Sequence, residues 1–388
     1  MGGWVDLDMN KTELKENITK IEQLLRSDNY EGGFELIKTI NETEITEGLS
    51  DVINTTLREK YFQNNALEAG LQIANFINLT SLDLSSCDLK NIDALANLTN
   101  LTELDLSGNN FLKNVDVLAN LINITKLKLN YCDSLQNVDV LANLINLTYL
   151  DLSQNFHIKN IDALTNLTNL TNLNLSHCEL LQNNIDVLVN LTNLTSLDLS
   201  NFKTLNLDLL ENLTKLTRLN LFRCRSLLNI DQLSHLSNLT FLDLGWCINL
   251  NNIDALANLT NLTSLDLSNV LLKNIDALAN LTNLTELDLS GCDLKNIDAL
   301  ANLTNLTELD LGGNNFLKNV DALANLTNIT MLFLRHCNSL QNVNALANLP
   351  NLTTLDLQYS DKVEPYGDRI LHFSDVTSYQ EQIKKSMK

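Results

Sequence analysis

The chain has 388 residues, of which 44% are hydrophobic and 19% are charged, a composition typical of an ordinary soluble protein that need not be disordered. Its 47 acidic residues outnumber its 26 Lys and Arg residues, and the resulting net charge of −21 argues against binding to nucleic acid or to an anionic membrane surface. No apolar segment in the sequence reaches the length of a membrane span.

The first predicted segment covers residues 1–56, where Leu14, Ile18 and Ile21 recur at helical spacing. We expect short helices that form an N-terminal cap. Residues 57–78 carry apolar residues at the spacing of the repeat that follows, and we expect them to form a degenerate capping repeat. No basic region followed by an apolar run opens the sequence, and Asn-x-Thr motifs that would be glycosylated in a secretory compartment recur throughout. These two features favour a cytoplasmic, bacterial protein.

One pattern repeats every 22 to 24 residues between residues 79 and about 360. Its framework in one copy consists of Leu101, Leu104, Leu106, Asn109, Val115, Leu118 and Leu121. The alternating leucines predict a short strand, and the later residues at three-residue spacing predict a helical or 3-10 return. Thirteen copies begin at Leu79, Leu101, Ile124, Leu147, Leu170, Leu194, Leu216, Leu239, Leu262, Leu284, Leu306, Ile329 and Leu352.

This pattern closely resembles the 22-residue leucine-rich class of bacterial internalins and of the regulatory subunits of eukaryotic protein phosphatases. The resemblance covers about three quarters of the chain. It implies an α/β solenoid, a leucine-rich-repeat horseshoe with a parallel concave β-sheet and short helical or 3-10 convex returns. Because the class shares a framework and not a ligand, the resemblance implies macromolecular recognition without naming the partner. Residues 361–388 are expected to form a C-terminal cap and tail.

All seven cysteines occupy the ninth position of the repeat: Cys87, Cys132, Cys178, Cys224, Cys247, Cys292 and Cys337. Asn109, Asn155 and Asn314 occupy this position in other copies. The side chain there is expected to point into the turn after the strand, where Asn or a small buried thiol fits. We therefore expect reduced, buried cysteines and neither disulfides nor a metal site.

A second column of residues opens the return segment of most repeats. It consists of Asp93, Asp116, Asp139, Asp162, Asp186, Asp208, Asp231, Asp254, Asp276, Asp298 and Asp321. Aspartate at this place can accept hydrogen bonds from free backbone N–H groups, so we expect these residues to cap the returns.

A third column lies on the strands and is expected to point outward, and its longest run is Asp243, Asp266, Asp288 and Asp310. Like charges in neighbouring strands repel one another by about 1 kcal/mol in water and by more at lower effective dielectric. Three explanations for tolerating this cost remain open. The row could face a basic partner surface, it could serve solubility, or it could form a ladder for divalent cations.

Signals of catalysis are absent from the sequence. It contains no phosphate-binding glycine loop with a lysine, no His-Glu-x-x-His and no Cys-x-x-Cys. His177 and His336 stand beside framework cysteines, but a thiol pointing inward and an imidazole pointing outward cannot act as a nucleophile and its base. We expect a protein that is not an enzyme, with no catalytic residues, no cofactor and no metal.

Residues 87–138 and 292–343 are recent copies that align without a gap and differ at 8 of 52 positions. Five differences fall on outward strand positions, which make up ten of the 52: Ser107/Gly312, Lys126/Met331, Lys128/Phe333, Asn130/Arg335 and Tyr131/His336. The framework was kept while the concave surface changed, as expected if that face selects the partner.

The predicted centre of partner binding consists of Arg218, Phe222, Arg223, Phe241 and Trp246, all assigned to outward strand positions. Arginine and aromatic residues dominate interface energetics, and here they interrupt an acidic background. The predicted secondary contacts are Lys126, Lys128, Tyr131, Tyr149, Met331, Phe333, Arg335 and His336.

Together with the acidic row, these residues predict a scaffold that binds a protein with a basic patch, and neither nucleic acid nor membrane. The sequence leaves the oligomeric state open. In the alternative hypothesis, the chain is an effector or toxin-like protein whose N-terminal helices carry the activity while the repeats target it.

Overall fold

The computed structural model describes residues 16–17, 19–21, 23–24, 79–181, 184–363, 370–372 and 374–387. Apart from these few positions, the predicted N-terminal cap and the degenerate repeat lie outside the described residues. The chain divides into two compact units, Met1–Leu170 and Thr171–Lys388.

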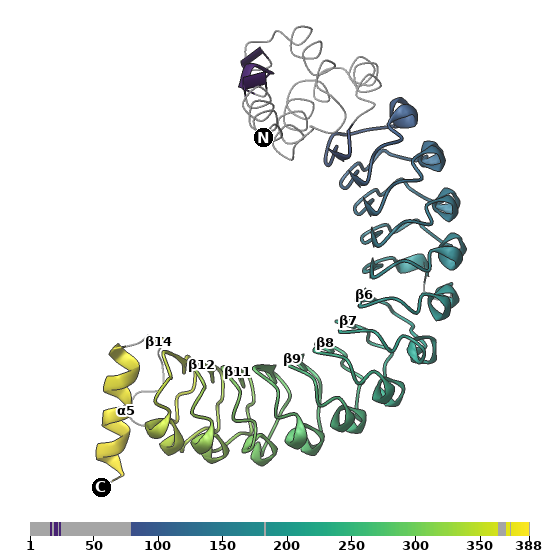
Figure 1. Cartoon of the computed structure of the whole chain (residues 1–388). Helices are drawn as coiled ribbons and strands as arrows, with labels where there is room; N and C mark the ends of the chain where they lie inside the picture. The colour runs from purple at the N-terminus through teal and green to yellow at the C-terminus, as the bar shows by residue number, and fades with distance from the viewer. Residues whose placement is uncertain are drawn as a thin grey trace, which may run out of the picture. The chain divides into compact units, whose positions relative to one another are not determined.

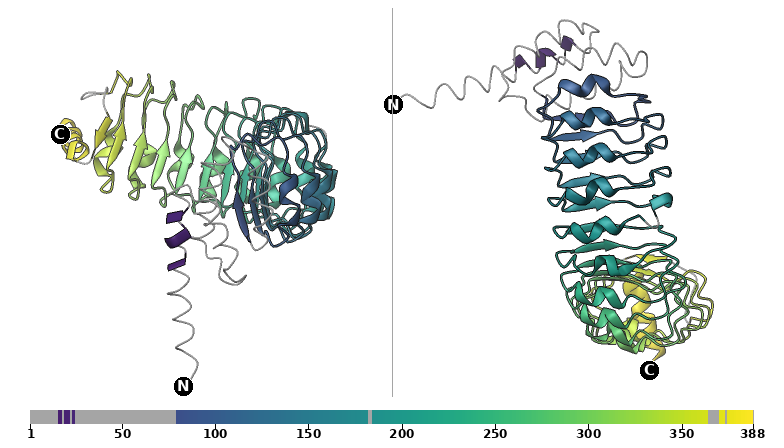
Figure 2. Two further views of the ribbon diagram at one scale, coloured as in Figure 1. Left: turned by 90° about the horizontal axis from the view of Figure 1, so that it is seen from above. Right: turned by 90° about the vertical axis from the view of Figure 1, so that its right-hand side faces the viewer.

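The described part of the first unit holds four parallel strands in sequence order: β1 (Ser81–Asp83), β2 (Glu103–Asp105), β3 (Lys126–Lys128) and β4 (Tyr149–Asp151). Each strand leads into a 3-10 turn of the return: η2 (Asp93–Asn97), η3 (Asp116–Asn120), η4 (Asp139–Asn143) and η5 (Asp162–Asn166). The right-hand view of Figure 2 shows these coils stacked strand upon strand.

The second unit contains β5 (Asn172–Asn174), β6 (Ser196–Asp198), β7 (Arg218–Asn220), β8 (Phe241–Asp243), β9 (Ser264–Asp266), β10 (Glu286–Asp288), β11 (Glu308–Asp310), β12 (Met331–Phe333), β13 (Thr354–Asp356) and β14 (Ile370–His372). Its 3-10 turns are η6 (Glu179–Leu181), η7 (Asp186–Asn190), η8 (Leu207–Leu210), η9 (Asp231–His235), η10 (Asp254–Asn258), η11 (Asp276–Asn280), η12 (Asp298–Leu300), η13 (Asp321–Asn325) and η14 (Asn344–Asn348). Within this unit the strands lie on the inner side of the curve and the 3-10 turns on the outer side (Figure 1). The leucine-rich-repeat fold predicted from the sequence is therefore confirmed.

The framework residues fill the interior of every coil. In the second repeat, Leu101, Leu104, Leu106, Leu112, Val115, Leu118 and Leu121 are all at most 1% exposed. Each such side chain contributes about 1.5–3 kcal/mol relative to an exposed one, before the cost of ordering the chain. A single coil leaves these side chains open to water above and below, so the core exists only in the stack.

Two hydrogen-bond ladders join successive coils and explain why Asn-Leu-Thr recurs. The Thr125 hydroxyl donates to the carbonyl of Thr102 at 3.1 Å, at the entry to the strands. On the return side, Asn123 Nδ2 donates to the carbonyl of Thr99 at 2.8 Å. The motif is therefore a structural element of the stack, because both of its polar residues satisfy backbone groups of the preceding coil.

The ninth repeat position is buried, as the sequence predicts. Asn155 Nδ2 donates to the carbonyls of Leu129 and Leu152 at 2.9 and 2.7 Å, and its Oδ1 accepts from the backbone N–H of Cys132. Where cysteine replaces Asn, the thiol donates to the carbonyl of the preceding coil, as Cys224 does to the carbonyl of Leu199 at 3.2 Å. All seven cysteines are buried and form no disulfide, so the predicted framework role is confirmed.

The prediction that the aspartates cap the returns is wrong, because an asparagine side chain and not the aspartate accepts the hydrogen bond at the start of the turn. Asp116 is the first residue of η3, the N-cap position is held by the buried Val115, and no side-chain cap bond forms there. Instead, Asn114 Oδ1 accepts from the backbone N–H of Asp116 at 2.6 Å, and Asn114 Nδ2 donates to the Asp116 carboxylate at 2.9 Å. Asparagine therefore closes the turn, and aspartate holds the asparagine in place.

The last strand and helix end the sheet of the second unit. β14 pairs antiparallel with β13, and helix α5 (Ser374–Ser386) packs against η14 and β14. Val376 and Ile383 bury their side chains, and Gln380 Nε2 donates to the carbonyls of Leu346 and Leu349, both at 2.8 Å. Two carbonyls at the end of the stack thereby gain a partner from α5.

Candidate protein-binding face

We define the sheet face as the two residues that flank the central leucine of each strand, together with the two turn residues after the next leucine. In the β7 coil these are Arg218, Asn220, Phe222 and Arg223. Their side chains are exposed or half-buried, whereas the leucines between them are buried. The sheet face is thus the surface on which the chain can vary without disturbing its core.

The acidic row lies on this face in the predicted register. Asp243 pairs with Asp266, Asp266 with Asp288, and Asp288 with Asp310 along the parallel strands β8 to β11. Each carboxylate also accepts a hydrogen bond from the backbone N–H two residues later, as Asp266 does from Ser268 at 2.7 Å. Each aspartate of the row therefore closes the turn that follows its strand, in addition to carrying charge. None of the three sequence-based explanations included this hydrogen-bonding role.

This hydrogen bond requires an oxygen but not a charge. Asn174 and Asn220 stand at the same repeat position, and their amide oxygens accept from the N–H of Ser176 and Phe222, both at 2.9 Å. The repeated Asp-Leu-Ser and Asp-Leu-Gly sequences are the signal that could have revealed the bond. Because Asn performs the same role, the bond leaves the negative charge of the row unexplained.

The row is electrostatically unfavourable in the absence of a partner. Burial, and after it the charge of Asp266, raises the pKa of the Asp243 carboxyl to about 7. Burial, together with the charge of Asp288, raises the pKa of Asp310 to about 6, and burial also raises the pKa of Asp266. These aspartates are held close together in a partly dehydrated place where each resists ionisation.

The five predicted central residues come together on the coils of β7 and β8, and we call them the arginine–aromatic patch. The Arg218 guanidinium stacks on the Phe241 ring at 4.0 Å from its centroid, across the paired strands. The Arg223 guanidinium lies between two rings, 5.1 Å from that of Phe222 and 5.4 Å from that of Trp246.

The prediction that all five occupy strand positions is wrong for three of them. Only Arg218 and Phe241 belong to strands. Phe222, Arg223 and Trp246 lie in the turns that follow, because the strands are only three residues long. Arg223 and Trp246 have φ angles of 59° and 60°, an uncommon conformation for residues other than glycine that carries both side chains onto the sheet face.

In the first unit, the predicted contacts gather around Lys126 and Lys128. Lys128 Nζ lies 2.9 Å from Asp105 Oδ2, and Lys126 Nζ lies 3.6 Å from Glu103 Oε2. The Lys126 ammonium is also 5.9 Å from the ring centroid of Tyr149. Tyr131, the last predicted contact residue of this unit, lies in the turn after β3 and is 51% exposed.

The contacts predicted around β12 are also adjacent in the second unit. Met331 and Phe333 flank the central leucine of β12, and Arg335 Nη2 lies 3.3 Å from Asp310 Oδ2. The His336 ring stacks on Tyr359 with centroids 4.6 Å apart and an interplanar angle of 11°. Tyr359 was missed in the sequence because its repeat is the last and departs from the common pattern.

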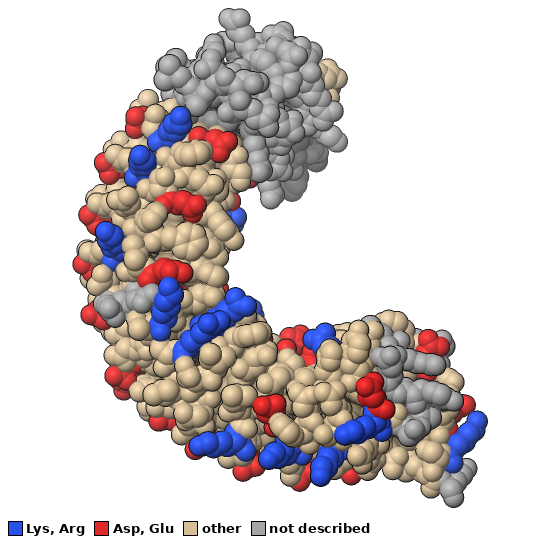
Figure 3. Space-filling model, turned by 180° about the vertical axis from the view of Figure 1, so that it is seen from behind, with Lys and Arg blue, Asp and Glu red and all other residues tan. Residues whose placement is uncertain are grey.

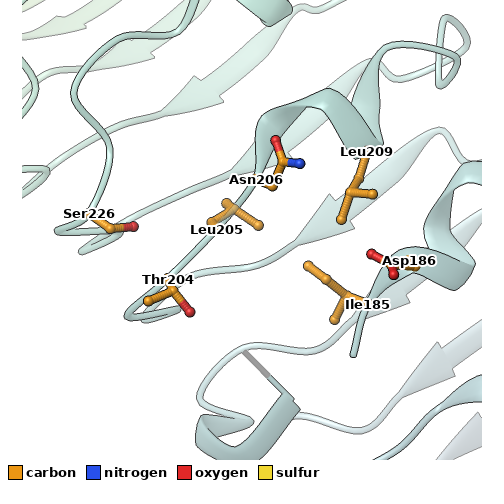
Figure 4. A pocket seen from close by; sticks show the side chains of 7 residues that line it. All are labelled: Ile185, Asp186, Thr204, Leu205, Asn206, Leu209 and Ser226. Carbon is orange, nitrogen blue, oxygen red and sulfur yellow. The ribbon is translucent and has the colours of Figure 1, made fainter. Parts of the chain in front are cut away.

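A separate hollow of about 380 Å³ lies near η7 and η8, away from the sheet face (Figure 4). It is lined by Ile185, Asp186, Thr204, Leu205, Asn206, Leu209 and Ser226. Asp186 is the one ionisable side chain of this lining, so the hollow offers neither a pair of catalytic groups nor a set of metal ligands.

A metal site and a membrane-spanning helix each have structural requirements that can be compared with the described residues. In this part of the chain, no three His, Cys, Asp or Glu side chains are placed to hold a metal ion. The described helices also include none long and apolar enough to cross a bilayer. On the surface seen in Figure 3, acidic and basic side chains are spread among uncharged ones.

Comparison with known families and structures agrees with this fold. Residues 77–120 and 282–325 match the family of leucine-rich repeats in two copies, and residues 138–219 match the leucine-rich repeats of Zer-1-like proteins. No curated protein matches the chain.

Among solved structures, an internalin (InlF) of Listeria monocytogenes is 27% identical over 83% of this chain and 95% of its own, with a TM-score of 0.65. The functional domain of InlJ from the same organism, which includes a cysteine ladder, is 28% identical over 76% of this chain and 68% of its own, with a TM-score of 0.53. A leucine-rich-repeat protein of Leptospira interrogans, at 21% identity and a TM-score of 0.56 over 83% of this chain and 96% of its own, shares the fold alone. The chain is therefore a leucine-rich-repeat protein whose structure resembles that of the Listeria internalins.

Proposed function

We propose that this chain is a non-enzymatic scaffold that recognises a protein partner through its sheet face. The observation that carries the proposal is the arginine–aromatic patch, where two exposed arginines and the 37% exposed Trp246 are stacked on one surface. Arginine and tryptophan are the residues that most often dominate binding energy. Leucine-rich-repeat domains generally bind proteins and are usually not catalytic, which supports the same assignment.

Two further clusters and the acidic row would offer contacts of their own. In the first unit the cluster around Lys126, Lys128, Tyr131 and Tyr149 offers secondary contacts. In the second unit Met331, Phe333, Arg335 and His336 do the same. Because the row from Asp243 to Asp310 carries repelling charges, a partner with a basic surface there would relieve the repulsion. We also propose a bacterial cytoplasm as the site of action, since seven buried cysteines that form no disulfide are ordinary in a reducing compartment.

Alanine variants of the patch test the proposal. The full chain and its Trp246→Ala and Phe222→Ala variants are used to capture partners from a bacterial lysate, and affinity is then measured for the captured protein. We expect each variant to weaken binding by about 2 kcal/mol, a loss of roughly thirtyfold, with little change in melting temperature. Phe316→Ala is the matched control, because this aromatic side chain is 51% exposed but lies outside the sheet face.

Unchanged affinity in both variants would remove the patch from the centre of binding. If variants at Lys126 or Phe333 then abolished binding, the sheet face would remain the contact surface with a different energetic centre. The charge argument has a test of its own. Association should slow as salt rises from low to physiological concentration, because screening weakens the attraction between the acidic row and a basic partner.

A further inference from the structure

Two arginines on the sheet face have stacking partners but no ionic partner within the described residues. The Arg218 and Arg223 guanidiniums lie over aromatic rings, whereas the described ion pairs on the sheet face belong to Lys126, Lys128 and Arg335. A guanidinium that stacks through its flat face keeps its N–H donors free at its edge. The two side chains are thus held in place with their donors available to an anion.

Charge on the sheet face changes sign within a short distance of these arginines. On the β7 coil the face carries Arg218 and Arg223, two positive charges. On the coils of β8 to β11 it carries six carboxyl groups and an excess of negative charge, from Asp243, Asp266, Asp288, Asp310, Glu286 and Glu308. At ~4.8 Å per strand, β7 and β10 are about 14 Å apart, which an extended segment of four or five residues spans.

This separation restricts the chemistry of the partner. A polyanion that satisfied the arginines would run into the acidic row, and a uniformly basic surface would place cations against the arginines. A segment with a carboxylate at one end and basic side chains at the other fits both parts of the face. Charge complementarity therefore favours a protein segment of divided charge over nucleic acid or lipid.

We propose that the arginine–aromatic patch binds a carboxylate of the partner, while basic side chains of the same segment lie over β9 to β11, so that the segment docks in a single orientation. This inference rests on the proposed function and specifies which partner chemistry the sheet face selects. It also assigns different roles to the arginine–aromatic patch and to the acidic row, which the sequence-based prediction combined into one surface for a basic partner.

Labelled synthetic peptides can test the carboxylate assignment with the full chain. The first has a glutamate pair and a lysine cluster separated by about four uncharged residues, to match the spacing of the strands. The second replaces the glutamates with lysines, and the third distributes the charges of the first evenly. We expect the divided peptide to bind most tightly by fluorescence anisotropy, with the other two weaker by about tenfold or more.

Charge reversal at the arginines supplies the reciprocal measurement. The double variant Arg218→Glu plus Arg223→Glu should lose affinity for the divided peptide and gain affinity for the all-lysine peptide. A milder variant, Arg218→Gln plus Arg223→Gln, repeats the loss if charge reversal disturbs folding. Arg225→Glu is the matched control, because Arg225 is exposed in the same coil but lies outside the sheet face.

Orientation can be read by cross-linking to single introduced cysteines. The native thiols are buried, so a new cysteine at Ser196 on β6 or at Ser290 after β10 would be the accessible one among the described residues. A bromoacetyl group at the glutamate end of the divided peptide should alkylate the Ser196→Cys chain, and the same group at the lysine end should alkylate the Ser290→Cys chain. Equal labelling of both sites from either end would overturn the single orientation.

The carboxylate assignment fails if the all-lysine peptide binds the natural chain as tightly as the divided peptide and if the arginine variants leave the affinity for both peptides unchanged. That result would leave the proposed function intact, because Trp246→Ala and Phe222→Ala test it on a captured partner independently of these peptides. Conversely, loss of peptide binding in the arginine variants without any effect of the alanine variants on partner capture would remove the patch from the centre of partner binding and would leave the charge pattern intact.

Discussion

Lys128 Nζ lies 2.9 Å from Asp105 Oδ2, across the register of strands β3 and β2. Burial raises the pKa of this carboxyl, but hydrogen bonds from Ser107 and Lys128 outweigh that effect and lower the pKa overall. In the second copy of the duplicated segment, Asp310 instead faces Phe333, and its pKa rises to about 6 although Arg335 lies nearby. The two aspartates thus differ in their cross-strand partner, in the hydroxyl donor that Ser107 supplies and Gly312 lacks, and in the direction of the pKa change.

Exchanging these partners should exchange the behaviour of the two aspartates. We expect Phe333→Lys to lower the pKa of Asp310 and Lys128→Met to raise the pKa of Asp105, because a cation within hydrogen-bonding distance favours the charged carboxylate. Carboxyl 13C chemical shifts followed through a pH titration provide the measurement. Lys318→Met serves as the control, and equal titration curves for all three variants and the natural chain would contradict the expectation.

The acidic row should make the protein less stable as the pH rises from about 4 to about 7. The folded state holds the Asp243 and Asp310 protons more tightly than the unfolded state, whose pKa is near 3.8, so it binds more protons in this window. The free-energy cost of ionising these two carboxyls in the folded state is fully present above pH 7 and is absent well below pH 4. After allowance for solvent screening, we expect a loss on the order of 1–2 kcal/mol, measured by urea unfolding at several pH values.

Asp243→Asn isolates the contribution of one carboxyl. Asn220 shows that an amide at this position accepts the same backbone hydrogen bond, so the variant should fold normally and lose only the charge. Its unfolding free energy should depend less steeply on pH than that of the natural chain. A slope equal to that of the natural chain would show that Asp243 ionises normally in the fold.

The buried asparagine ladder predicts a graded response at Asn314. Its amide donates to the carbonyls of Leu289 and Leu311 at 2.9 and 2.7 Å, and its oxygen accepts from the N–H of Leu294. Asn314→Ala should destabilise the chain by about 2–4 kcal/mol, because several buried groups lose their partner. Asn314→Cys should cost less, since a thiol at the equivalent position, that of Cys292, still donates to the carbonyl of Leu267 in the preceding coil. Equal losses in denaturant unfolding would refute this difference.

The native thiols should react slowly until the chain unfolds. All seven are buried, and burial raises the pKa of Cys132, Cys247, Cys292 and Cys337 to about 12, so little thiolate is present at neutral pH. Labelling with a thiol reagent is followed with and without denaturant, and Ser290→Cys gives the rate of an accessible thiol. Rapid modification of most native cysteines would contradict their framework role.

We propose that α5 is the C-terminal cap, and one buried residue tests this. Ile383 is 1% exposed, so Ile383→Asp would bury a carboxylate and should destabilise the chain by about 3 kcal/mol or more. Lys384→Asp places the same side chain at the exposed neighbouring position and should have little effect. Similar melting temperatures for the two variants would show that α5 contributes no stability to the stack.

Much of the candidate site could be predicted because the repeat itself locates it. Once Leu216 and Leu239 are aligned, Arg218 and Phe241 must lie on adjacent strands and on the same face. The stacking of Arg223 between Phe222 and Trp246 could not be predicted, because it depends on the positive φ angles of the turn. The sequence pattern identified the acidic row, and the repeated Asp-Leu-Ser and Asp-Leu-Gly sequences could also have revealed the hydrogen bonds at the strand ends, but the size of the pKa changes depends on burial in the stack.

The spacing of apolar residues alone determined the repeat, its buried leucines and the place of every cysteine, because those features follow from which side chains a coil can remove from water. Only the stacked structure decided which charges meet. Asp105 and Lys128 are 23 residues apart along the chain and 2.9 Å apart in space, and the burial that raises the pKa of Asp243 exists only when neighbouring coils cover it. Electrostatic energy depends on distance and on solvent exclusion, and both are properties of the assembled coils and not of any single repeat.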